Sequence, residues 1–364
     1  MPALTHPYPA TIVRRNDEPP AFVPGSPDLD AVKAAIVRPA GSADRLIRLA
    51  RADMDGVDAL ILARMKSPVS IIPMLAEHLI AAGGKRLRPL LTVGAARLAG
   101  GRDNSALKLA AAVEFIHTAT LLHDDVVDSS QLRRGRVAAH LIWGAPSSVL
   151  VGDFLFARAF ELMVETGSLK ALEILARASR VIAEGEVLQL TRAHDLKLSQ
   201  VMYLEIISAK TAELFAAAAE AGAVSAGAPA CQAAALRAYG QSLGLAFQLT
   251  DDALDYGGAT ETLGKNAGDD FREGKATLPL LLAIARSGPR EADFWERAIG
   301  RKEQTEADFR RARELVVGLG ALEATLDLAS AYADAAKSAL DVFPQSEWRE
   351  ALEQLADFAV SRRA

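Results

Sequence analysis

Apolar residues recur at helical spacing along most of this chain, and no segment alternates apolar and polar positions convincingly, as a half-buried strand would. One stretch, residues 106–122, is apolar nearly all round and is expected in the core. No fixed-period repeat is found. The pattern predicts helices over residues 43–60, 68–81, 106–122, 170–190, 200–221 and from 232 into an acidic motif at 251, with further helices from 277 to 364. We therefore predict an all-α fold.

Three aspartates close the apolar stretch: Asp124, Asp125 and Asp128. Asp124 and Asp128 share a helix face, and Asp125 lies about 100° around the helix from Asp124. These like charges repel one another, and the C-terminal end of a helix disfavours anions. The cluster is therefore either a solvated helix end or a site for a hard cation, Mg²⁺ or Mn²⁺.

A second motif with the same Asp-Asp-x-x-Asp spacing ends the later apolar helix, at residues 251–255. Gln248, Asp252 and Asp255 form a stripe on this helix, with Asp251 beside it. If the two helices pack side by side and parallel, six carboxylates converge on one end of the fold. So much negative charge in a cleft requires divalent cations and an anionic ligand.

Basic residues adjoin these acids along the chain. Lys85 and Arg88 lie in a Gly-Gly-Lys-Arg-Leu-Arg-Pro segment at a helix start, which is either a plain basic loop or a diphosphate site. Arg133 and Arg134 follow the first acidic motif and either neutralise it or bind phosphate oxygens. Metal-bridged phosphates between the acidic and basic segments would satisfy both.

Two further basic elements follow. Lys210 precedes Thr211 in a largely apolar helix, where a lysine either extends to solvent or faces a cavity and needs an anion. The Gly-rich, charged segment 264–275 has the composition of a mobile lid, which would bring Lys265 and Lys275 to a phosphate.

His117 lies two turns before Asp124 on almost the same helix face. It is either a satisfied core histidine or a polar neighbour of the carboxylates. Glu114 gives it the Glu-x-x-His spacing of di-iron bundles, but no other histidine has a glutamate three residues before it. A di-iron site is therefore disfavoured.

Composition narrows the class of protein. Half of the 364 residues are apolar and only 5% are aromatic, which favours packed helices over a β-sandwich. The net charge of -5 argues against nucleic acid as the main partner, and the single Cys231 excludes a disulfide framework. Charges, Gly or Pro interrupt each candidate membrane span, so we expect a cytoplasmic protein without a transmembrane segment.

The N-terminal 40 residues differ from the rest, because they hold 8 of the 16 prolines. Such a segment is expected to be extended or disordered. We therefore divide the chain into a Pro-rich extension, residues 1–40, and one all-α domain, residues 41–364.

Taken together, the two Asp-rich motifs, the segment 84–89, Arg133-Arg134 and Lys210-Thr211 resemble the trans-isoprenyl diphosphate synthases over roughly residues 45–364. The segments 114–128 and 182–190 are most similar to the long-chain, octaprenyl-type polyprenyl synthases. The resemblance implies an isoprenoid-synthase-type helical bundle around a deep central cavity, and usually a homodimer. It implies sequential condensation of isopentenyl diphosphate onto an allylic diphosphate.

The resemblance also implies roles for individual residues. The residues expected to bind isopentenyl diphosphate are Lys85, Arg88, His117 and Arg134. Those expected to hold the allylic diphosphate are Arg133, Lys210, Thr211, Gln248 and Lys265. Asp124, Asp128, Asp251 and Asp255 are the expected ligands of Mg²⁺, three ions with substrate bound, and Asp125 and Asp252 complete the catalytic motifs. Ala209 departs from close relatives, which often have Ser before the Lys-Thr pair, and we expect little effect.

Product length is expected to depend on the residues just before the first motif. Short-chain relatives place a bulky aromatic residue five positions before the first aspartate, where this chain has Ala119, followed by Thr120. Small side chains leave room for a long product, so we predict a C40–C50 chain for a quinone side chain, which could draw the enzyme to a membrane surface. Alternatives are a shorter-chain synthase, a class I terpene cyclase and a non-catalytic regulatory subunit.

Overall fold

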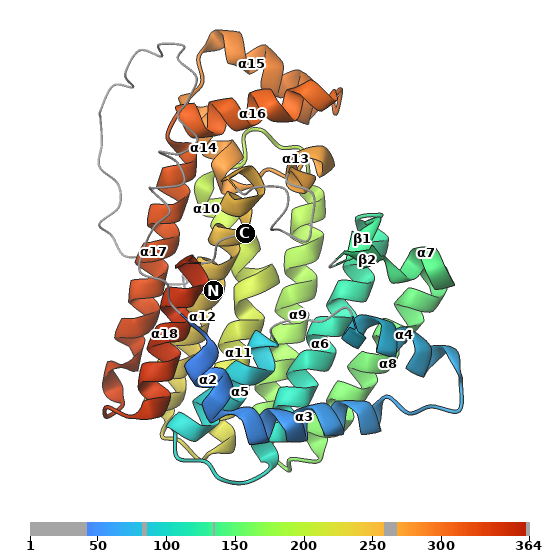
Figure 1. Ribbon diagram of the computed structural model, residues 1–364, viewed down its shortest axis with the longest axis vertical. Coiled ribbons are helices and arrows are strands. Elements are labelled where there is room, and N and C mark those ends of the chain that lie inside the picture. The colour runs from blue at the N-terminus through green and yellow to red at the C-terminus, as the bar shows by residue number, and fades with distance from the viewer. Residues whose placement is uncertain (1–41, 82–85, 134, 258–267, 362–364) are drawn as a thin grey trace, which may run out of the picture.

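The computed structural model describes residues 42–81, 86–133, 135–257 and 268–361, and helices make up nearly all of it (Figure 1). Up to residue 164 the elements are α2 (Asp44–Leu49), α3 (Arg51–Arg64), α4 (Ile71–Ala81), α5 (Leu87–Leu98), α6 (Ser105–Val127), β1 (Leu132–Arg133), β2 (Arg136–Val137), α7 (Ala139–Trp143) and α8 (Ala145–Val164). Next come α9 (Leu169–Thr191), α10 (Gln200–Ile207), the π-helical turn η1 (Ser208–Ala212), α11 (Glu213–Ser225) and α12 (Ala230–Gly257). The last are α13 (Asp269–Glu273), α14 (Leu278–Arg286), α15 (Pro289–Trp295), η2 (Glu296–Gly300), α16 (Glu306–Gly318), α17 (Ala321–Ala339), η3 (Leu340–Val342) and α18 (Glu347–Ser361). The predicted all-α fold is confirmed.

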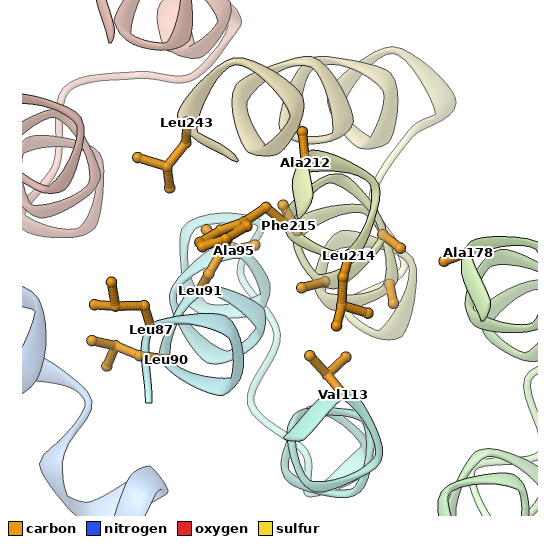
Figure 2. Close-up of a cluster of buried hydrophobic side chains, with 14 of the residues drawn as sticks. Leu87, Leu90, Leu91, Ala95, Val113, Ala178, Ala212, Leu214, Phe215 and Leu243 are labelled. Atoms are coloured by element: carbon orange, nitrogen blue, oxygen red, sulfur yellow. The ribbon is translucent and has the colours of Figure 1, made fainter. Parts of the chain in front are cut away.

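Helix α11 forms the centre of the bundle, and nearly all of its residues are buried. It packs against α5, α6, α9 and α12. Figure 2 shows Leu214 and Phe215 of α11 among Leu91 of α5, Val113 of α6 and Leu243 of α12. The small residues of α11, mainly alanines, let these surrounding helices approach closely.

The two helices that carry the acidic motifs, α6 and α12, share no extended contact, because α11 lies between them and packs against both (Figure 1). The side-by-side packing considered from sequence is therefore wrong. Their acidic ends still face the same part of the bundle. Lys210 and Thr211 are adjacent in the chain, and one contacts Asp124 of α6 while the other contacts Gln248 of α12.

The predicted helix over residues 200–221 is interrupted by η1. A π turn accommodates one extra residue within a helix and is frequent at functional sites. Here it contains Lys210 and Thr211, so the irregularity falls on two of the residues that the sequence singles out.

A short antiparallel hairpin, β1–β2, follows the first acidic motif, although no convincing strand is predicted from sequence. Its strands are two residues long, too short to produce a recognisable alternation. The hairpin pairs Arg133 with Arg136 and holds Arg133 near the end of α6.

One described helix, α6, is long and apolar enough to cross a membrane by length and composition alone, so the expected absence of a transmembrane segment stays a prediction. Its apolar window is 56% buried inside the bundle, as in the core helix of a soluble protein. The bent pair α16–α17 meets the same test only if it is counted as one span. The predicted extension, residues 1–40, lies outside the described residues.

Candidate functional site

Two aspartates of the first motif, Asp124 and Asp128, each face a lysine. Their side chains are 18% and 19% exposed. Lys210 Nζ lies 3.8 Å from Asp124 Oδ2, and Lys275 Nζ donates a 3.1 Å hydrogen bond to Asp128 Oδ2. Burial raises the pKa of Asp124, and the charge of Lys210 partly offsets this. Both carboxylates are thus balanced by cations from distant parts of the chain.

Asp125 instead points into the protein, where its side chain is only 1% exposed. Arg133 donates from Nε to Asp125 Oδ1 at 2.8 Å, and its Nη2 donates to the same oxygen. Asp125 Oδ2 is buried and has no hydrogen-bond partner within the described ranges. The carboxylate therefore anchors the guanidinium group of Arg133 beside α6.

Asp252 of the second motif is buried as well, and both of its oxygens accept hydrogen bonds. Gln248 Nε2 donates to Oδ1 at 2.7 Å, and the hydroxyl of the buried Tyr203 donates to Oδ2. Gln248 Oε1 in turn accepts a 2.9 Å hydrogen bond from Thr211 Oγ1. Burial, followed by repulsion from Asp270, raises the pKa of Asp252 to about 8. Asp252 thus orients Gln248 toward η1.

Asp255 lies one turn further along α12 and has one unsatisfied oxygen. Its Oδ1 accepts a 3.1 Å hydrogen bond from the backbone N–H of Gly268, whereas Oδ2 is buried with no partner in the described part of the chain. Burial, followed by repulsion from Asp270, raises the pKa of Asp255 to about 7. Asp251 is exposed at the same helix end.

Lys210 lies between two acids that belong to different helices. Its Nζ donates a 2.7 Å hydrogen bond to Glu186 Oε2 of α9, in addition to the longer contact with Asp124. Burial raises the pKa of Glu186, and Lys210 opposes this shift. Together with Thr211, Lys210 makes η1 the link between the α6 side and the α12 side of the site.

Lys275 follows α13 and makes the corresponding contact with the other end of the first motif. It lies 3.1 Å from Asp128 Oδ2 and 2.5 Å from Glu273 Oε2. Burial disfavours the charged lysine, but Asp270, Asp128 and Glu273 outweigh it and raise the pKa of Lys275 well above its ordinary value. Lys275 therefore remains a cation at neutral pH.

Arg88 and His117 form a separate pair deeper along α6. Arg88 Nη1 lies 3.1 Å from His117 Nε2, and its guanidinium carbon lies 4.4 Å from the centre of the Phe215 ring. Since His117 precedes Asp124 by two helical turns, this pair is about 10 Å from the acidic motif along the helix. The predicted site residues Lys85, Arg134 and Lys265 lie outside the described residues.

The residues present fit a hard cation, although not as a preformed cage. Among the described residues, no three carboxylate, imidazole or thiol groups lie close enough to hold a metal ion. The convergence of six carboxylates, considered from sequence for helices packed side by side, is not seen among the described residues, because Asp125 and Asp252 turn inward and α11 packs between α6 and α12. Asp124, Asp128 and the unsatisfied Asp255 Oδ2 still offer the oxygen ligands that such a cation prefers. It would need further oxygens from water or phosphate.

Two residues of this network were not predicted to have a role. Glu186 was noted only as part of an amphipathic helix and of the segment 182–190 that carries the resemblance, although Gly185 beside it is a mid-helix glycine, which often marks a close approach. Tyr203 lies in an apolar run that carries no signal of function. Their partners, Lys210 and Asp252, could be predicted because they belong to motifs.

Comparison with known proteins identifies the family. A family model described as polyprenyl synthetase matches residues 69–316. The chain is 46% identical to the octaprenyl diphosphate synthase of Escherichia coli over 323 residues, which cover 88% of this chain and 98% of that protein.

Solved structures agree with this result. A polyprenyl synthase from Caulobacter crescentus, described as complexed with calcium and isoprenyl diphosphate, superposes with a TM-score of 0.88 and is 80% identical, covering 90% of this chain and all of that chain. A decaprenyl diphosphate synthase from Rhodobacter capsulatus superposes with a TM-score of 0.83 at 52% identity, covering 88% of this chain and 98% of that chain. The fold is therefore that of the isoprenoid synthases.

The raised pKa of Asp252 predicts how stability depends on pH in the absence of divalent cations. A carboxyl group whose pKa is higher in the folded state binds its proton more tightly there, so protonation stabilises the fold. For Asp252 this contribution to the free energy of unfolding is complete below about pH 4 and is lost as the pH rises through about 8. In EDTA, the melting temperature of Asp252→Asn should fall less than that of the wild type as the pH is raised from 6 to 9. Melting followed by circular dichroism measures this difference.

The matched control for this experiment is Asp251→Asn, which removes the exposed neighbouring carboxylate. It should change the dependence on pH less than Asp252→Asn does, because the charge of Asp251 raises the pKa of Asp252 less than burial and Asp270 do. Asp255 still titrates in the Asp252→Asn variant, so the slope should shrink without vanishing. Equal slopes for the wild type and Asp252→Asn would contradict the assignment of the buried charge to Asp252.

Proposed function

The chain belongs to the polyprenyl synthetase family, and we propose that this prenyltransferase is a long-chain trans-polyprenyl diphosphate synthase. It condenses isopentenyl diphosphate repeatedly onto an allylic diphosphate, farnesyl or geranylgeranyl diphosphate, and yields a C40–C50 product. The observation that carries the proposal is the position of Lys210 and Thr211, which contact the ends of both acidic helices from one turn. A diphosphate bound there meets cations and carboxylates from both sides.

The allylic diphosphate is held by groups from four elements. Lys210 and Thr211 of η1, Gln248 of α12 and Arg133 of β1 face the site, and the resemblance adds Lys265, which lies outside the described residues. Asp125 and Asp252 keep Arg133 and Gln248 in place through the hydrogen bonds described above. Charged and preoriented donors of this kind bind phosphate oxygens well.

Mg²⁺ or Mn²⁺, three ions in the complex with substrate, would be held by Asp124, Asp128, Asp251 and Asp255. When bound, they supply positive charge that stabilises the departing diphosphate. The similar Caulobacter crescentus synthase, which is complexed with calcium and isoprenyl diphosphate, supports a divalent cation together with a diphosphate in this fold.

Isopentenyl diphosphate binds at the second basic site, where Arg88 and His117 already contact each other and where Lys85 and Arg134 are expected. This second anion site favours a synthase over a terpene cyclase, because a cyclase takes a single diphosphate. The intact acidic motifs likewise favour a catalytic chain over a regulatory subunit.

The reaction begins when the C–O bond of the allylic substrate breaks and its electron pair leaves with the diphosphate. Lys210 and Arg133 stabilise that developing negative charge. The double bond of isopentenyl diphosphate then forms a new C–C bond to the allylic carbon, and a proton leaves the adjacent carbon of the resulting cation. The released diphosphate accepts this proton. The apolar side chains around α6 and α11 keep water from capturing the cation.

The chain works as a homodimer in the cytoplasm and supplies the side chain of a quinone. Its long apolar product draws it to a membrane surface for release. The likeness to octaprenyl diphosphate synthases supports this part of the proposal.

One assay tests the proposed activity. The protein is incubated with farnesyl diphosphate, radiolabelled isopentenyl diphosphate and Mg²⁺, and the extracted products are sized. We expect labelled polyprenyl diphosphates of C40–C50 that disappear in EDTA. Cyclised products without label would indicate a cyclase, and no extension by the protein alone would indicate a regulatory subunit.

Replacing Ala119 tests the expected control of product length. Ala119 is fully buried on α6, two residues beyond His117, so a ring placed there would lie in the interior of the bundle. Ala119→Phe should shift the main product to C15–C20, because the added ring blocks the growing chain. Chromatography of the extracted prenyl alcohols measures the shift.

A matched variant, Ala112→Phe, places the same ring two helical turns deeper, about 10 Å along α6, which is the length of about two isoprene units. Its product should be longer than that of Ala119→Phe and shorter than that of the wild type. If Ala119→Phe folds with an unchanged melting temperature and keeps the wild-type products, the growing chain does not pass Ala119.

A further inference from the structure

Glu186 is the nearest acidic partner of Lys210. The distance from Lys210 Nζ to Glu186 Oε2 is 2.7 Å, compared with 3.8 Å to Asp124 Oδ2. The side chains of Glu186 and Lys210 are 24% and 22% exposed, so the pair lies at the site but is partly shielded from water. The ammonium group that is proposed to bind the allylic diphosphate is thus already engaged.

The backbone around this pair brings the two residues together. A Cβ atom at Gly185 would lie 2.7 Å from Ala209 Cβ and 3.0 Å from Lys210 N, so α9 and η1 are in direct backbone contact at this point. A larger residue at Gly185 or Ala209 would push α9 and η1 apart. The contact between Glu186 and Lys210 therefore results from the packing of α9 on η1. It differs in this from an ion pair between two mobile surface side chains.

We propose that Glu186 is a positioning residue that holds Lys210 in place before diphosphate binds and competes with diphosphate for it. The inference rests on the proposed function, in which Lys210 binds the allylic diphosphate. Glu186 fixes where the ammonium group stands, and its negative charge neutralises part of the positive charge that Lys210 offers to the diphosphate. An enzyme that releases one diphosphate per condensation benefits from a site that does not retain it.

The substitution Glu186→Gln separates the two effects. The amide oxygen of glutamine still accepts the hydrogen bond from Lys210, so the ammonium group keeps its place. The negative charge is lost, so diphosphate should bind more tightly. We expect its dissociation constant to fall about three- to tenfold, as for one charge removed at close range in a partly solvated site.

The measurement is calorimetric titration of inorganic diphosphate into the protein in excess Mg²⁺. The matched control is Glu184→Gln on the same helix, because Glu184 pairs with Arg180 and is 61% exposed, away from Lys210. Glu184→Gln should change the dissociation constant less than twofold. Unchanged or weaker binding by Glu186→Gln, or an equal gain in Glu184→Gln, would overturn the proposal.

A double-mutant cycle shows whether Glu186 acts through Lys210. In a Lys210→Met background, Glu186→Gln should tighten diphosphate binding by less than it does alone, because its partner is gone. An undiminished gain would mean that Glu186 repels diphosphate directly, against the proposal. Prenyl transfer by the wild type is measured in a separate assay. A wild type without this activity would contradict the proposed function, whereas the binding measurements above test the role of Glu186.

Discussion

The site depends on two ion pairs that balance the first acidic motif without closing it. Lys210 lies beside Asp124, and Lys275 lies beside Asp128. Both lysines come from elements far along the chain, so the acidic end of α6 is neutralised only in the folded protein. Lys210 Nζ lies 3.8 Å from Asp124 Oδ2, and Lys275 Nζ lies 3.1 Å from Asp128 Oδ2. Both carboxylates keep oxygens that can coordinate another cation.

Within each acidic motif, the second aspartate has a different task from its neighbours. Asp125 anchors Arg133, and Asp252 orients Gln248, so each carboxylate supports a residue that faces the site. The energetic cost is the burial of charge, which is visible in the raised pKa of Asp252. In the first motif the spacing therefore serves two purposes, because i and i+4 place Asp124 and Asp128 beside the two lysines while i+1 turns Asp125 inward.

This division of roles explains why the site lacks a preformed metal cage. Helix α11 packs between α6 and α12. Asp124 and Asp128 contact lysines, and Asp255 accepts from a backbone N–H. A cation arriving alone would find too few oxygens at any one point. A cation arriving with a diphosphate would find them on both sides, and Lys210, Arg133 and Gln248 would hold the rest of the ligand.

Much of the fold and of the candidate site could be predicted from sequence. The rest could not, for physical reasons that particular residues show. Helical periodicity located the main helices, and repeated spacing identified Asp124, Asp128 and Asp255, because such patterns are local. The sequence could not reveal that α11 separates α6 from α12, because that depends on the packing of the whole core.

Contacts between distant segments were also beyond prediction. Glu186 meets Lys210 only because Gly185 lets two backbones touch, and Tyr203 reaches Asp252 from an apolar run without a motif. The π turn at η1 was equally hidden, since an extra residue in a helix leaves little trace in hydrophobic spacing.

The most direct test of this account is the linkage between cation and diphosphate. Calorimetry would measure the binding of Mg²⁺ with and without a non-hydrolysable farnesyl diphosphate analogue, and of the analogue with and without Mg²⁺. We predict that each ligand raises the affinity for the other by the same factor, about a hundredfold, as thermodynamic linkage requires. Tight binding of Mg²⁺ to the free protein, or binding of the analogue that is unchanged in EDTA, would contradict the account.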